Sequence, residues 1–359
     1  MKAAVLYGKE DVRVEEVAPK PLQPGEVRIA IEAALTCGTD LKVYKRGYHA
    51  RMIVPPAVFG HELSGTVCEV HSPRSTVPAS GSQAQTSASG AGVAEWRVGE
   101  RVVVANSAPC GDCFFCGNGQ ENLCDDLLFV NGAYAQSIVV PARVAAKNML
   151  RLKSETPFAD AALVEPLACV VQGIQDSRVR AGQRVLVIGS GPIGLMFVAL
   201  ARHLGCAVSV SGRGEQRLEL ARKLGAARII DAASQAELPT PGSRDGYDVV
   251  IEAVGKPQTW EAAVRLVRKG GTVNFFGGCP SGTSVTLDTA LLHYSNLSLL
   301  ASFHHTPRSI REALGFIERG VIRAADFVDG ECPLSELPAL FQSMARGNRA
   351  IKTLVRVRA

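Results

Sequence analysis

The sequence has no long apolar run, no block of basic residues and few aromatic residues, which make up 6% of its 359 positions. Lysine and arginine exceed aspartate and glutamate by only five, 39 against 34, and this excess is spread along the chain. A nucleic-acid partner is therefore not expected, because such a partner needs a concentrated positive patch. The longest apolar stretch, 185–201, is short for a membrane span and contains three glycines and a proline. It predicts a strand, a turn and a helix, and we expect no membrane partner.

The N-terminus offers no secretory signal. Residues 1–8 are followed directly by the charged positions 9–11, so the apolar segment is too short for one. We therefore expect a cytoplasmic protein. The composition, 47% hydrophobic and 20% charged, is that of a soluble globular protein, and the length suggests about two domains.

Two kinds of pattern divide the chain. Up to about residue 104 the strands are short and separated by Pro and Gly, which indicates a mostly β half. From residue 158 apolar strands alternate with helical runs, which is typical of a parallel sheet with crossover helices. We expect strands in the first half at 12–14, 26–31 and 101–104; strands in the second half at 184–188, 207–210, 227–230, 248–252, 271–276 and 297–300; helices at 192–203, 215–224, 309–319 and 334–346; and a closing strand at 350–357.

The segment 72–94 has an unusual composition. Of its 23 residues, 16 are Ser, Thr, Ala or Gly, and it has one charge and no large apolar side chain. Because such a segment buries little apolar surface, we expect a mobile surface loop.

The ten cysteines are unevenly distributed. Four of them follow the spacing Cys110-x2-Cys113-x2-Cys116-x7-Cys124 in a loop rich in Gly, Asp and Asn. Four thiolates can wrap a tetrahedral zinc ion, and such a closed shell predicts a structural role. An iron–sulfur cluster and a set of unrelated thiols are the alternatives. Five scattered cysteines have apolar or small neighbours and are expected to be buried, inert thiols: Cys68, Cys169, Cys206, Cys279 and Cys332.

A glycine fingerprint lies between a predicted strand and a predicted helix. It reads Gly189-Ser190-Gly191-Pro192-Ile193-Gly194. Its glycines permit a tight turn and close backbone approach, and the helix N-terminus faces a pyrophosphate. The context predicts dinucleotide binding.

The second predicted strand of this unit indicates which dinucleotide binds. A carboxylate that binds the adenosine ribose is expected at its end, but the chain has Ser211-Gly212-Arg213-Gly214 there. The missing acid, with Arg213 at that point and Arg217 one turn later, favours a 2′-phosphate and hence NADP. The alternative is a solvated Arg213 and a site for NAD.

Three further segments complete a pattern: Cys37-Gly38-Thr39-Asp40, Gly60-His61-Glu62 and Val164-Glu165-Pro166. With the four-cysteine loop and the fingerprint, in this order along essentially the whole chain, they resemble the zinc-dependent medium-chain alcohol dehydrogenases. The Glu-Pro-Leu form at 165–167 resembles the polyol branch, which includes sorbitol and threonine dehydrogenases. Classical alcohol dehydrogenases have a cysteine there.

The resemblance implies an α/β fold with two domains. A mostly β, GroES-like catalytic domain would span 1–155 and carry the four-cysteine zinc lobe at 106–126. A doubly wound Rossmann domain would span 156–300 and bind the dinucleotide. The last segment, 301–359, would return to the catalytic domain.

The resemblance also implies roles for individual residues. Cys37, His61 and Glu165 would bind a catalytic zinc, and Glu62 would contact that ion directly or through water. Two zinc ions per chain are thus expected, one catalytic and one structural. Thr39 would take the proton of the alcohol while hydride leaves for the nicotinamide, and Asp40 would hold the His61 ring. The expected cofactor-binding residues are Gly189, Gly191, Pro192, Ile193, Gly194, Gly212, Arg213, Arg217 and Lys352, the last facing the cofactor or Glu62.

The chain departs from the family's pattern at three places. Lys42 occupies the position where many relatives have a proton-relay histidine, so Lys42 becomes a candidate catalytic or substrate-binding residue, with Tyr44 and His49 as alternatives. The segment 72–94 is longer than the family's usual turn. The run Phe303-His304-His305-Thr306 follows the last sheet strand and is either part of a substrate pocket or a solvated loop.

The resemblance favours one function. It is the transfer of hydride between NADP and a secondary alcohol or ketone of a polyol, sugar or aminocyclitol. An NAD-dependent threonine or sorbitol dehydrogenase activity is the alternative within enzymes, and a non-catalytic nucleotide-binding protein is the alternative outside them. The expected partners are a small polar alcohol or ketone and further copies of the chain in a homodimer or homotetramer.

Overall fold

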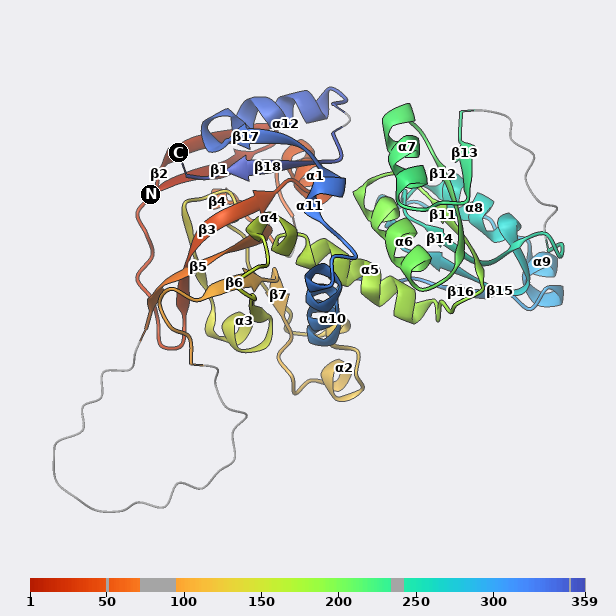
Figure 1. Ribbon diagram of the computed structural model, residues 1–359, viewed down its shortest axis with the longest axis horizontal. Helices are drawn as coiled ribbons and strands as arrows, with labels where there is room; N and C mark the ends of the chain where they lie inside the picture. Colours follow the sequence, from red (N-terminus) through yellow and green to blue (C-terminus); the bar gives the residue numbers. More distant parts are fainter. Residues whose placement is uncertain (50–51, 72–94, 234–241, 349, 359) are drawn as a thin grey trace, which may run out of the picture.

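The computed structural model describes residues 1–49, 52–71, 95–233, 242–348 and 350–358. The predicted surface loop at 72–94 lies outside these residues. Figure 1 shows two sheet-centred parts, with the first and last segments of the chain together in one part and the middle of the chain in the other. A helix, α5 (Val164–Asp176), runs between them.

The first part is built around a seven-stranded sheet in the order β10-β6-β5-β3-β18-β17, with β9 also paired to β3. Its longest strands, β3 and β5, pair antiparallel along their length. β3 shows little alternation between buried and exposed residues. Eight of its nine residues are buried or half-buried, because other elements cover both of its faces. The strands are β3 (Val27–Leu35), β5 (Glu62–Val70), β6 (Arg101–Val104), β9 (Ser137–Val140), β10 (Met149–Arg151), β17 (Val328–Pro333) and β18 (Lys352–Arg356).

Smaller elements surround this sheet. A three-stranded sheet has the order β2-β1-β4, and a two-stranded sheet pairs β7 with β8. The strands are β1 (Lys2–Gly8), β2 (Asp11–Glu16), β4 (Ala57–Val58), β7 (Ser107–Ala108) and β8 (Leu128–Phe129); the helices are α1 (Gly38–Arg46), α2 (Phe114–Gly117), η1 (Glu121–Leu123), α3 (Ala142–Lys147) and α4 (Phe158–Ala161).

The second part is a six-stranded sheet in the order β13-β12-β11-β14-β15-β16, and neighbouring strands in it run parallel. This is the order 3-2-1-4-5-6 of a doubly wound dinucleotide-binding sheet, whose ligand crevice lies where the order reverses, between β11 and β14. The strands are β11 (Arg184–Ile188), β12 (Ala207–Gly212), β13 (Arg228–Asp231), β14 (Tyr247–Glu252), β15 (Val267–Phe275) and β16 (Ser298–Leu300). The helices are α6 (Pro192–His203), α7 (Glu215–Lys223), α8 (Pro257–Leu266) and α9 (Thr289–Tyr294).

The chain after β16 returns to the first part. There β17 and β18 pair with each other, and β18 pairs antiparallel with β3. On the way, α10 (Pro307–Glu318) packs on α5, and its start is capped by Thr306, whose side chain accepts from the backbone N–H of Ser309. The remaining helices are α11 (Ala324–Phe327), η2 (Leu334–Glu336) and α12 (Leu337–Ala345).

The fold class predicted from the sequence is confirmed, and the predicted elements occur near their expected places. The expected strand at 271–276 is longer and begins at Val267, and the expected helix at 334–346 is a short η2 followed by α12. The domain boundaries after 155 and 300 stay predictions.

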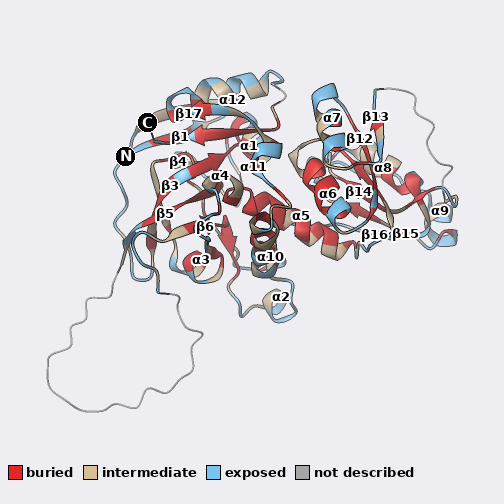
Figure 2. Cartoon of the chain, in the orientation of Figure 1, coloured by how far each residue is buried: buried red, intermediate tan, exposed pale blue. Residues whose placement is uncertain are grey.

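Buried side chains lie inside both parts. Figure 2 shows the buried residues concentrated on the strands and on the inner faces of α5 and α6. One apolar cluster continues from the parallel sheet through α5 and α10 to β3 and β6, so it joins the two parts. This shared core fixes the residues of α5 relative to the ends of β3 and β5, where the site described below lies.

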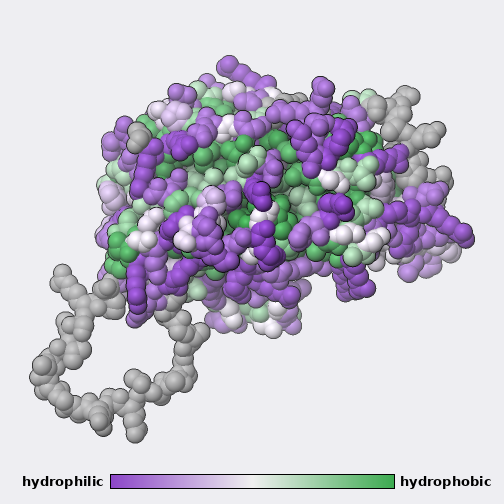
Figure 3. All heavy atoms as spheres, viewed as in Figure 1, coloured by the Kyte–Doolittle hydropathy of each residue, from purple (hydrophilic) through white to green (hydrophobic). Residues whose placement is uncertain are grey.

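The surface is mostly polar. In Figure 3 hydrophilic side chains cover most of the visible face, with hydrophobic ones between them. Over the described part of the chain, every helix is too short or too polar to cross a membrane.

The prediction of buried thiols for the scattered cysteines is only partly right. Cys206 and Cys332 are buried, and Cys169 and Cys279 are half-buried. Cys68 is exposed, which contradicts the prediction. It lies near the end of β5, where its neighbour Val67 points into the core and Cys68 therefore points outward.

Candidate active site

Two adjacent strands bring the first predicted site residues together. β3 ends at Leu35, which pairs with Glu62 at the start of β5. Cys37, two residues beyond β3, is the N-cap of α1, and its Sγ accepts the backbone N–H of Thr39 at 3.4 Å. The turn before β5 needs a glycine, because a Cβ on Gly60 (φ 92°) would lie 2.6 Å from the Tyr134 ring.

Cys37, His61 and Glu62 form a potential metal-binding group. One ligand atom from each lies within 4.8 Å of the others. His61 and Glu62 are 4% and 0% exposed, so their polar atoms are shielded from water. Thiolate, imidazole and carboxylate together are a ligand set that zinc accepts.

Asp40 orients the His61 ring, as predicted. Its Oδ1 lies 3.0 Å from Nδ1 of His61, and its Oδ2 accepts the Tyr134 hydroxyl at 2.6 Å. This partner leaves Nε2 of His61 as the nitrogen that can bind a metal. Burial alone would lower the pKa of His61, but the charges of Asp40 and Cys37 outweigh it and raise that pKa well above its usual value.

Lys352 is found on the Glu62 side of the site. Its ammonium forms an ion pair with Oε2 of Glu62 and donates to the Thr36 carbonyl at 3.1 Å. Both side chains are buried, whereas Oε1 of Glu62 has no hydrogen-bond partner among the described residues. Burial raises the pKa of Glu62, and the Lys352 charge opposes that rise.

Glu165 belongs to a second group. It lies in the first turn of α5, and one ligand atom each from Glu165, His304 and His305 lie within 4.8 Å of one another. Burial, opposed by the charge of His61 and reinforced by that of Glu62, raises the pKa of Glu165 to about 7. Glu165 is therefore within electrostatic reach of the first group, and its direct binding of zinc stays a prediction.

Of the two histidines in the segment 303–306, His305 is buried and His304 is half-buried. His305 is 2% exposed, its Nε2 lies 2.9 Å from Oδ1 of Asn106, and Nε2 of His304 lies 2.6 Å from Oγ of Ser107. Burial, together with the charge of His61, lowers the pKa of His304 to about 3. The alternative of a solvated loop is therefore wrong for these two residues, although Phe303 is exposed.

The candidates on and after α1 have different surroundings. Thr39 is half-buried beside Cys37. Lys42 is exposed, and its charge opposes the rise in the pKa of Cys279 that burial causes in the other part of the molecule. Tyr44 is buried against the Phe341 ring, with centroids 5.5 Å apart, so it is a core residue. His49 lines a cavity of about 620 Å³ between the cysteine lobe and Phe303.

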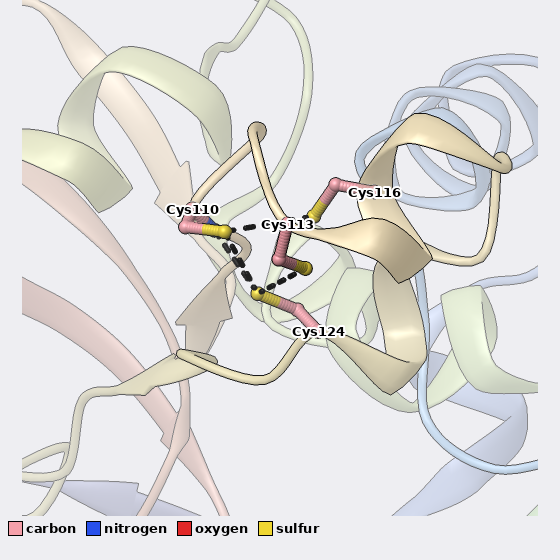
Figure 4. A group of neighbouring side chains, drawn as sticks. All are labelled: Cys110, Cys113, Cys116 and Cys124. Atoms are coloured by element: carbon pink, nitrogen blue, oxygen red, sulfur yellow. Dashed lines mark hydrogen bonds between the residues drawn. The ribbon is translucent and has the colours of Figure 1, made fainter.

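The four cysteines of the lobe point toward one another (Figure 4). The sulfur of Cys110 lies 3.9 Å from that of Cys116 and 3.4 Å from that of Cys124, and the sulfurs of Cys113 and Cys124 are 3.9 Å apart. Four sulfurs at about 2.3 Å from a tetrahedral zinc ion would be about 3.8 Å apart. The geometry thus fits a structural zinc ion.

The backbone around the lobe favours the thiolate form of Cys113. Hydrogen bonds from the backbone of Cys116 and Asp125 lower the pKa of Cys113 to about 6, whereas burial raises that of Cys116 to about 12. A bound cation would favour the thiolate form of all four. Lys147 donates to the Cys110 carbonyl at 2.7 Å and fastens the lobe to α3.

The glycine fingerprint has the geometry that its context predicts. Gly189 has φ 121°, and Pro192 opens α6 at the position where its missing N–H is harmless. A Cβ on Gly194 would lie 1.9 Å from the Gly189 carbonyl oxygen, so the helix can start this close to the strand only with glycine. Ile193 lies in the first turn of α6.

The end of β12 is held against the fingerprint. Oγ of Ser190 accepts the backbone N–H of Arg213 at 3.1 Å and lies 3.0 Å from its carbonyl oxygen. A Cβ on Gly212 would lie 2.3 Å from the same Oγ. Arg213 is exposed, and Arg217 donates to the Ala350 carbonyl at 3.1 Å. Ser190 therefore leaves no room for a ribose-binding carboxylate at position 212.

Comparison with known families decides the identity of the fold. Residues 23–150 match the alcohol dehydrogenase GroES-like domain, and residues 192–319 match the zinc-binding dehydrogenase domain. The chain belongs to the zinc-dependent medium-chain dehydrogenases. The family predicted from the sequence is thereby confirmed.

Relatives of this dehydrogenase cover almost its whole length. It is 31% identical to the D-altritol 5-dehydrogenase of Agrobacterium fabrum, over 95% of both chains, and 33% identical to the L-threonine 3-dehydrogenase of Pyrococcus furiosus, over 81% of this chain and 79% of the relative. Among solved structures, a zinc-binding dehydrogenase of Sinorhizobium meliloti 1021 bound to NADP is 29% identical, with a TM-score of 0.85 over 99% of this chain and 98% of that one.

Sequence reasoning missed several residues of the dehydrogenase's site. Tyr134 and Thr36 hold Asp40 and Lys352, and Asn106 and Ser107 hold the two histidines. The position of Asn106 and Ser107 directly after the strand 101–104 was an available signal. Tyr134 carries no such signal, because its hydroxyl reaches Asp40 only in the folded chain.

Proposed function

We propose that this chain is a zinc-dependent dehydrogenase that transfers hydride between a nicotinamide cofactor, with NADP favoured, and a secondary alcohol or ketone of a polyol, sugar or aminocyclitol. The observation that carries the proposal is the convergence of Cys37, His61 and Glu62 within 4.8 Å, in a chain that also has a dinucleotide fingerprint. A structural protein has no physical need for such an open ligand group.

We assign the catalytic zinc to Cys37 and His61, with the carboxylates of Glu62 and Glu165 facing it. When bound there, zinc would act as a Lewis acid on the substrate oxygen, and the nicotinamide would exchange the hydride. Asp40 fixes the tautomer of His61 by its 3.0 Å contact. Lys352 balances the charge of Glu62 and opposes the rise in the pKa of this carboxyl that burial causes.

Thr39 is proposed to take the proton of the alcohol. It lies in the first turn of α1, two residues after Cys37, and is half-buried. Lys42, one turn further along α1, is exposed and acts electrostatically on Cys279 across the two parts. We therefore propose that the ammonium of Lys42 donates to a substrate oxygen, at the position where many relatives have their proton-relay histidine.

The cofactor assignment rests on the loop after β12. Arg213 is exposed where an adenosine 2′-phosphate would lie, and the contact between Ser190 and Gly212 excludes a carboxylate that would repel it. The S. meliloti relative contains NADP, which supports the same choice. The fingerprint residues Gly189, Gly191, Pro192, Ile193 and Gly194 would hold the pyrophosphate.

The substrate class follows from the relatives. The names of relatives include D-altritol 5-dehydrogenase and sorbitol dehydrogenase, which favour a polyol. A homodimer or homotetramer, a cytoplasmic location and the domain boundaries 1–155, 156–300 and 301–359 are part of the same proposal.

A substrate panel tests the function. Polyols, amino alcohols including threonine, and sugar-derived ketones are each offered with NADP(H) and NAD(H), and the absorbance of the reduced nicotinamide is followed. We expect turnover with a polyol-type substrate and at least tenfold tighter binding of NADPH than of NADH, about 1.4 kcal/mol. Tenfold tighter binding of NADH would contradict the cofactor assignment, and turnover of threonine alone would contradict the substrate class.

A further inference from the structure

A buried carboxylate lies at the end of the strand that borders the cofactor crevice. Glu252 is the last residue of β14 and is 0% exposed. Burial raises the pKa of Glu252, and hydrogen bonds from neutral groups around it oppose that rise. Buried ionisable groups with shifted pKa values are concentrated at functional sites. We propose that Glu252 is a positioning residue for the nicotinamide half of the cofactor, because it fixes the loop 253–255 that forms one wall of the crevice.

The Glu252 carboxylate holds the loop that follows it. Its Oε1 accepts the backbone N–H of Val254 at 2.9 Å and that of Gly255 at 3.0 Å, and its Oε2 accepts the latter at 3.2 Å. Oε1 also accepts the Thr259 hydroxyl at 2.7 Å, which ties the loop to the first turn of α8. Two successive backbone N–H groups thus point at one carboxylate, so the loop 253–255 turns around the Glu252 side chain.

The loop 253–255 packs against the two neighbouring strand ends. On one side, a Cβ on Gly189 would lie 3.1 Å from the Ala253 carbonyl oxygen, so the loop lies against the fingerprint. On the other side, Gly277 donates its backbone N–H to the Glu252 carbonyl at 2.7 Å, and a Cβ on Gly277 would lie 2.8 Å from Oε2 of Glu252. The carboxylate therefore sets the spacing between the ends of β11, β14 and β15, where a doubly wound sheet binds its ligand.

The surroundings of Cys279 indicate which half of the cofactor this wall faces. Cys279 follows β15, and burial raises the pKa of its thiol, the charge of Glu252 raises it further and the charge of Lys42 opposes the rise. Lys42 belongs to α1, whose N-cap is Cys37. The loops after β14 and β15 therefore lie toward the zinc group, whereas β12, which leads to Arg213, is on the other side of β11. The nicotinamide must lie toward the zinc group, because it exchanges hydride with the substrate there.

The loop also presents an apolar side chain beside the fingerprint. Val254 is 40% exposed, and its Cγ2 would lie 3.1 Å from a Cβ on Gly189. Cofactor pockets are lined mainly by apolar side chains, with a few polar groups that fix their geometry. Because Glu252 accepts the backbone N–H of Val254, loss of its acceptor oxygens would release this side chain from its place in the wall. The adenosine half of the cofactor, on the β12 side, would be unaffected.

Cofactor titrations of the zinc-loaded protein test the inference, which rests on the proposed function. Glu252→Leu removes both acceptor oxygens, whereas Glu252→Gln keeps one. For Glu252→Leu we expect at least about tenfold weaker binding of the preferred dinucleotide, NADPH or NADH, in fluorescence titrations, and for Glu252→Gln a loss below about threefold. The adenosine half alone, adenosine 2′,5′-bisphosphate or AMP, should bind both variants within about twofold of the wild type in calorimetric titrations.

Asp248 provides the matched control on the same strand. It lies near the opposite end of β14, where its carboxylate accepts the backbone N–H of Arg184 at 2.6 Å and the side-chain Nε–H of Arg268 at 2.6 Å. Asp248→Leu should therefore lower the free energy of unfolding, measured by urea titration, and leave dinucleotide binding unchanged. Equal weakening of dinucleotide binding by Asp248→Leu and Glu252→Leu would overturn the inference, because it would reflect a general loss of stability.

Two further results would overturn the inference. One is a Glu252→Leu variant, folded by circular dichroism, that binds the dinucleotide as the wild type does or loses the adenosine half equally. The other needs no variant. In the wild type, the dinucleotide should slow amide hydrogen exchange in the segment 253–256 and the adenosine half alone should not, so unchanged exchange with the dinucleotide contradicts the role of this loop.

Failure of the inference is distinguishable from failure of the proposed function. If the wild type binds neither NADPH nor NADH, the proposed function fails and the role of Glu252 fails with it. If the wild type binds a dinucleotide and Glu252→Leu binds it equally well, the role of Glu252 fails and the proposed function stands.

Discussion

The buried pair of Lys352 and Glu62 gives a sharp prediction. The two side chains are 2% and 0% exposed, and Lys352 also donates to the Thr36 carbonyl at 3.1 Å. Lys352→Met keeps much of the side-chain volume but removes the ammonium, which leaves the Glu62 carboxylate buried without its cation. Breaking one side of a buried pair destabilises a protein by about 3–5 kcal/mol. We expect a loss of this size in the metal-free protein.

A double-mutant cycle isolates the pair. Glu62→Gln removes the negative charge, so the double variant Glu62→Gln/Lys352→Met has no unpaired charge and should recover more than about 2 kcal/mol of the loss. The free energy of unfolding is measured by urea titration after chelation of the metals. The exposed Lys20→Met variant is the control and should change this free energy by less than about 0.5 kcal/mol.

The outcome that refutes this reasoning is additivity. Each single variant lowers the free energy of unfolding by some amount. If the sum of these two decreases equals the decrease in the double variant within about 0.5 kcal/mol, the two charges do not interact in the folded protein. Measuring the free energy of unfolding again after zinc is restored gives a second test. The ion would partly balance Glu62, so the loss caused by Lys352→Met should shrink in the zinc-loaded protein.

Three further predictions concern the other parts of the molecule. Cys113→Ser should lower thermal stability more than it weakens cofactor binding, because a structural zinc ion contributes folding energy; differential scanning calorimetry and a cofactor titration check this. Ser190→Gly/Gly212→Asp should shift the preference from NADPH toward NADH by at least about tenfold in fluorescence titrations, whereas Gly212→Asp alone should weaken both cofactors, since its Cβ would lie 2.3 Å from the Ser190 hydroxyl. In metal-free protein, Glu165→Gln should stabilise the fold above pH 7 by about 3 kcal/mol, measured by urea titration, because the pKa of Glu165 is about 7 instead of 4.5.

The sign of the last prediction follows from proton linkage. The folded state holds the Glu165 proton more tightly than the unfolded state, so stability falls as the pH rises from 4.5 to 7. Below pH 4.5 Glu165→Gln should have little effect. The exposed Glu219→Gln and Cys68→Ser variants are the controls for Glu165→Gln and Cys113→Ser. A pH-independent effect of Glu165→Gln, or equal effects of Cys113→Ser and Cys68→Ser, would contradict these assignments.

The sequence predicts best those features that are encoded locally. The four cysteines lie within fifteen residues, and the fingerprint lies between a strand and a helix, so spacing alone indicates their geometry. The parallel arrangement of the strands follows from their alternation with helices. The family resemblance then adds the dispersed residues Cys37, His61 and Glu165, which no spacing rule joins.

Contacts between distant segments could not be predicted in the same way. Lys352 and Glu62 are 290 positions apart, and His305 and Asn106 are 199 apart. Their pairing depends on β18 joining β3 and on the chain after β16 returning to the first sheet. For the same reason the sequence did not show that Glu165 groups with His304 and His305.

The Cys37→Ser variant tests the central assignment most directly. Turnover of the best substrate of the panel with its preferred cofactor is measured beside zinc content and circular dichroism. We predict a folded protein with one zinc ion fewer than the wild type and turnover reduced by at least about a thousandfold, because a Lewis acid contributes several kcal/mol to the transition state. A folded variant that keeps wild-type turnover would show that Cys37 does not hold the ion that performs the chemistry.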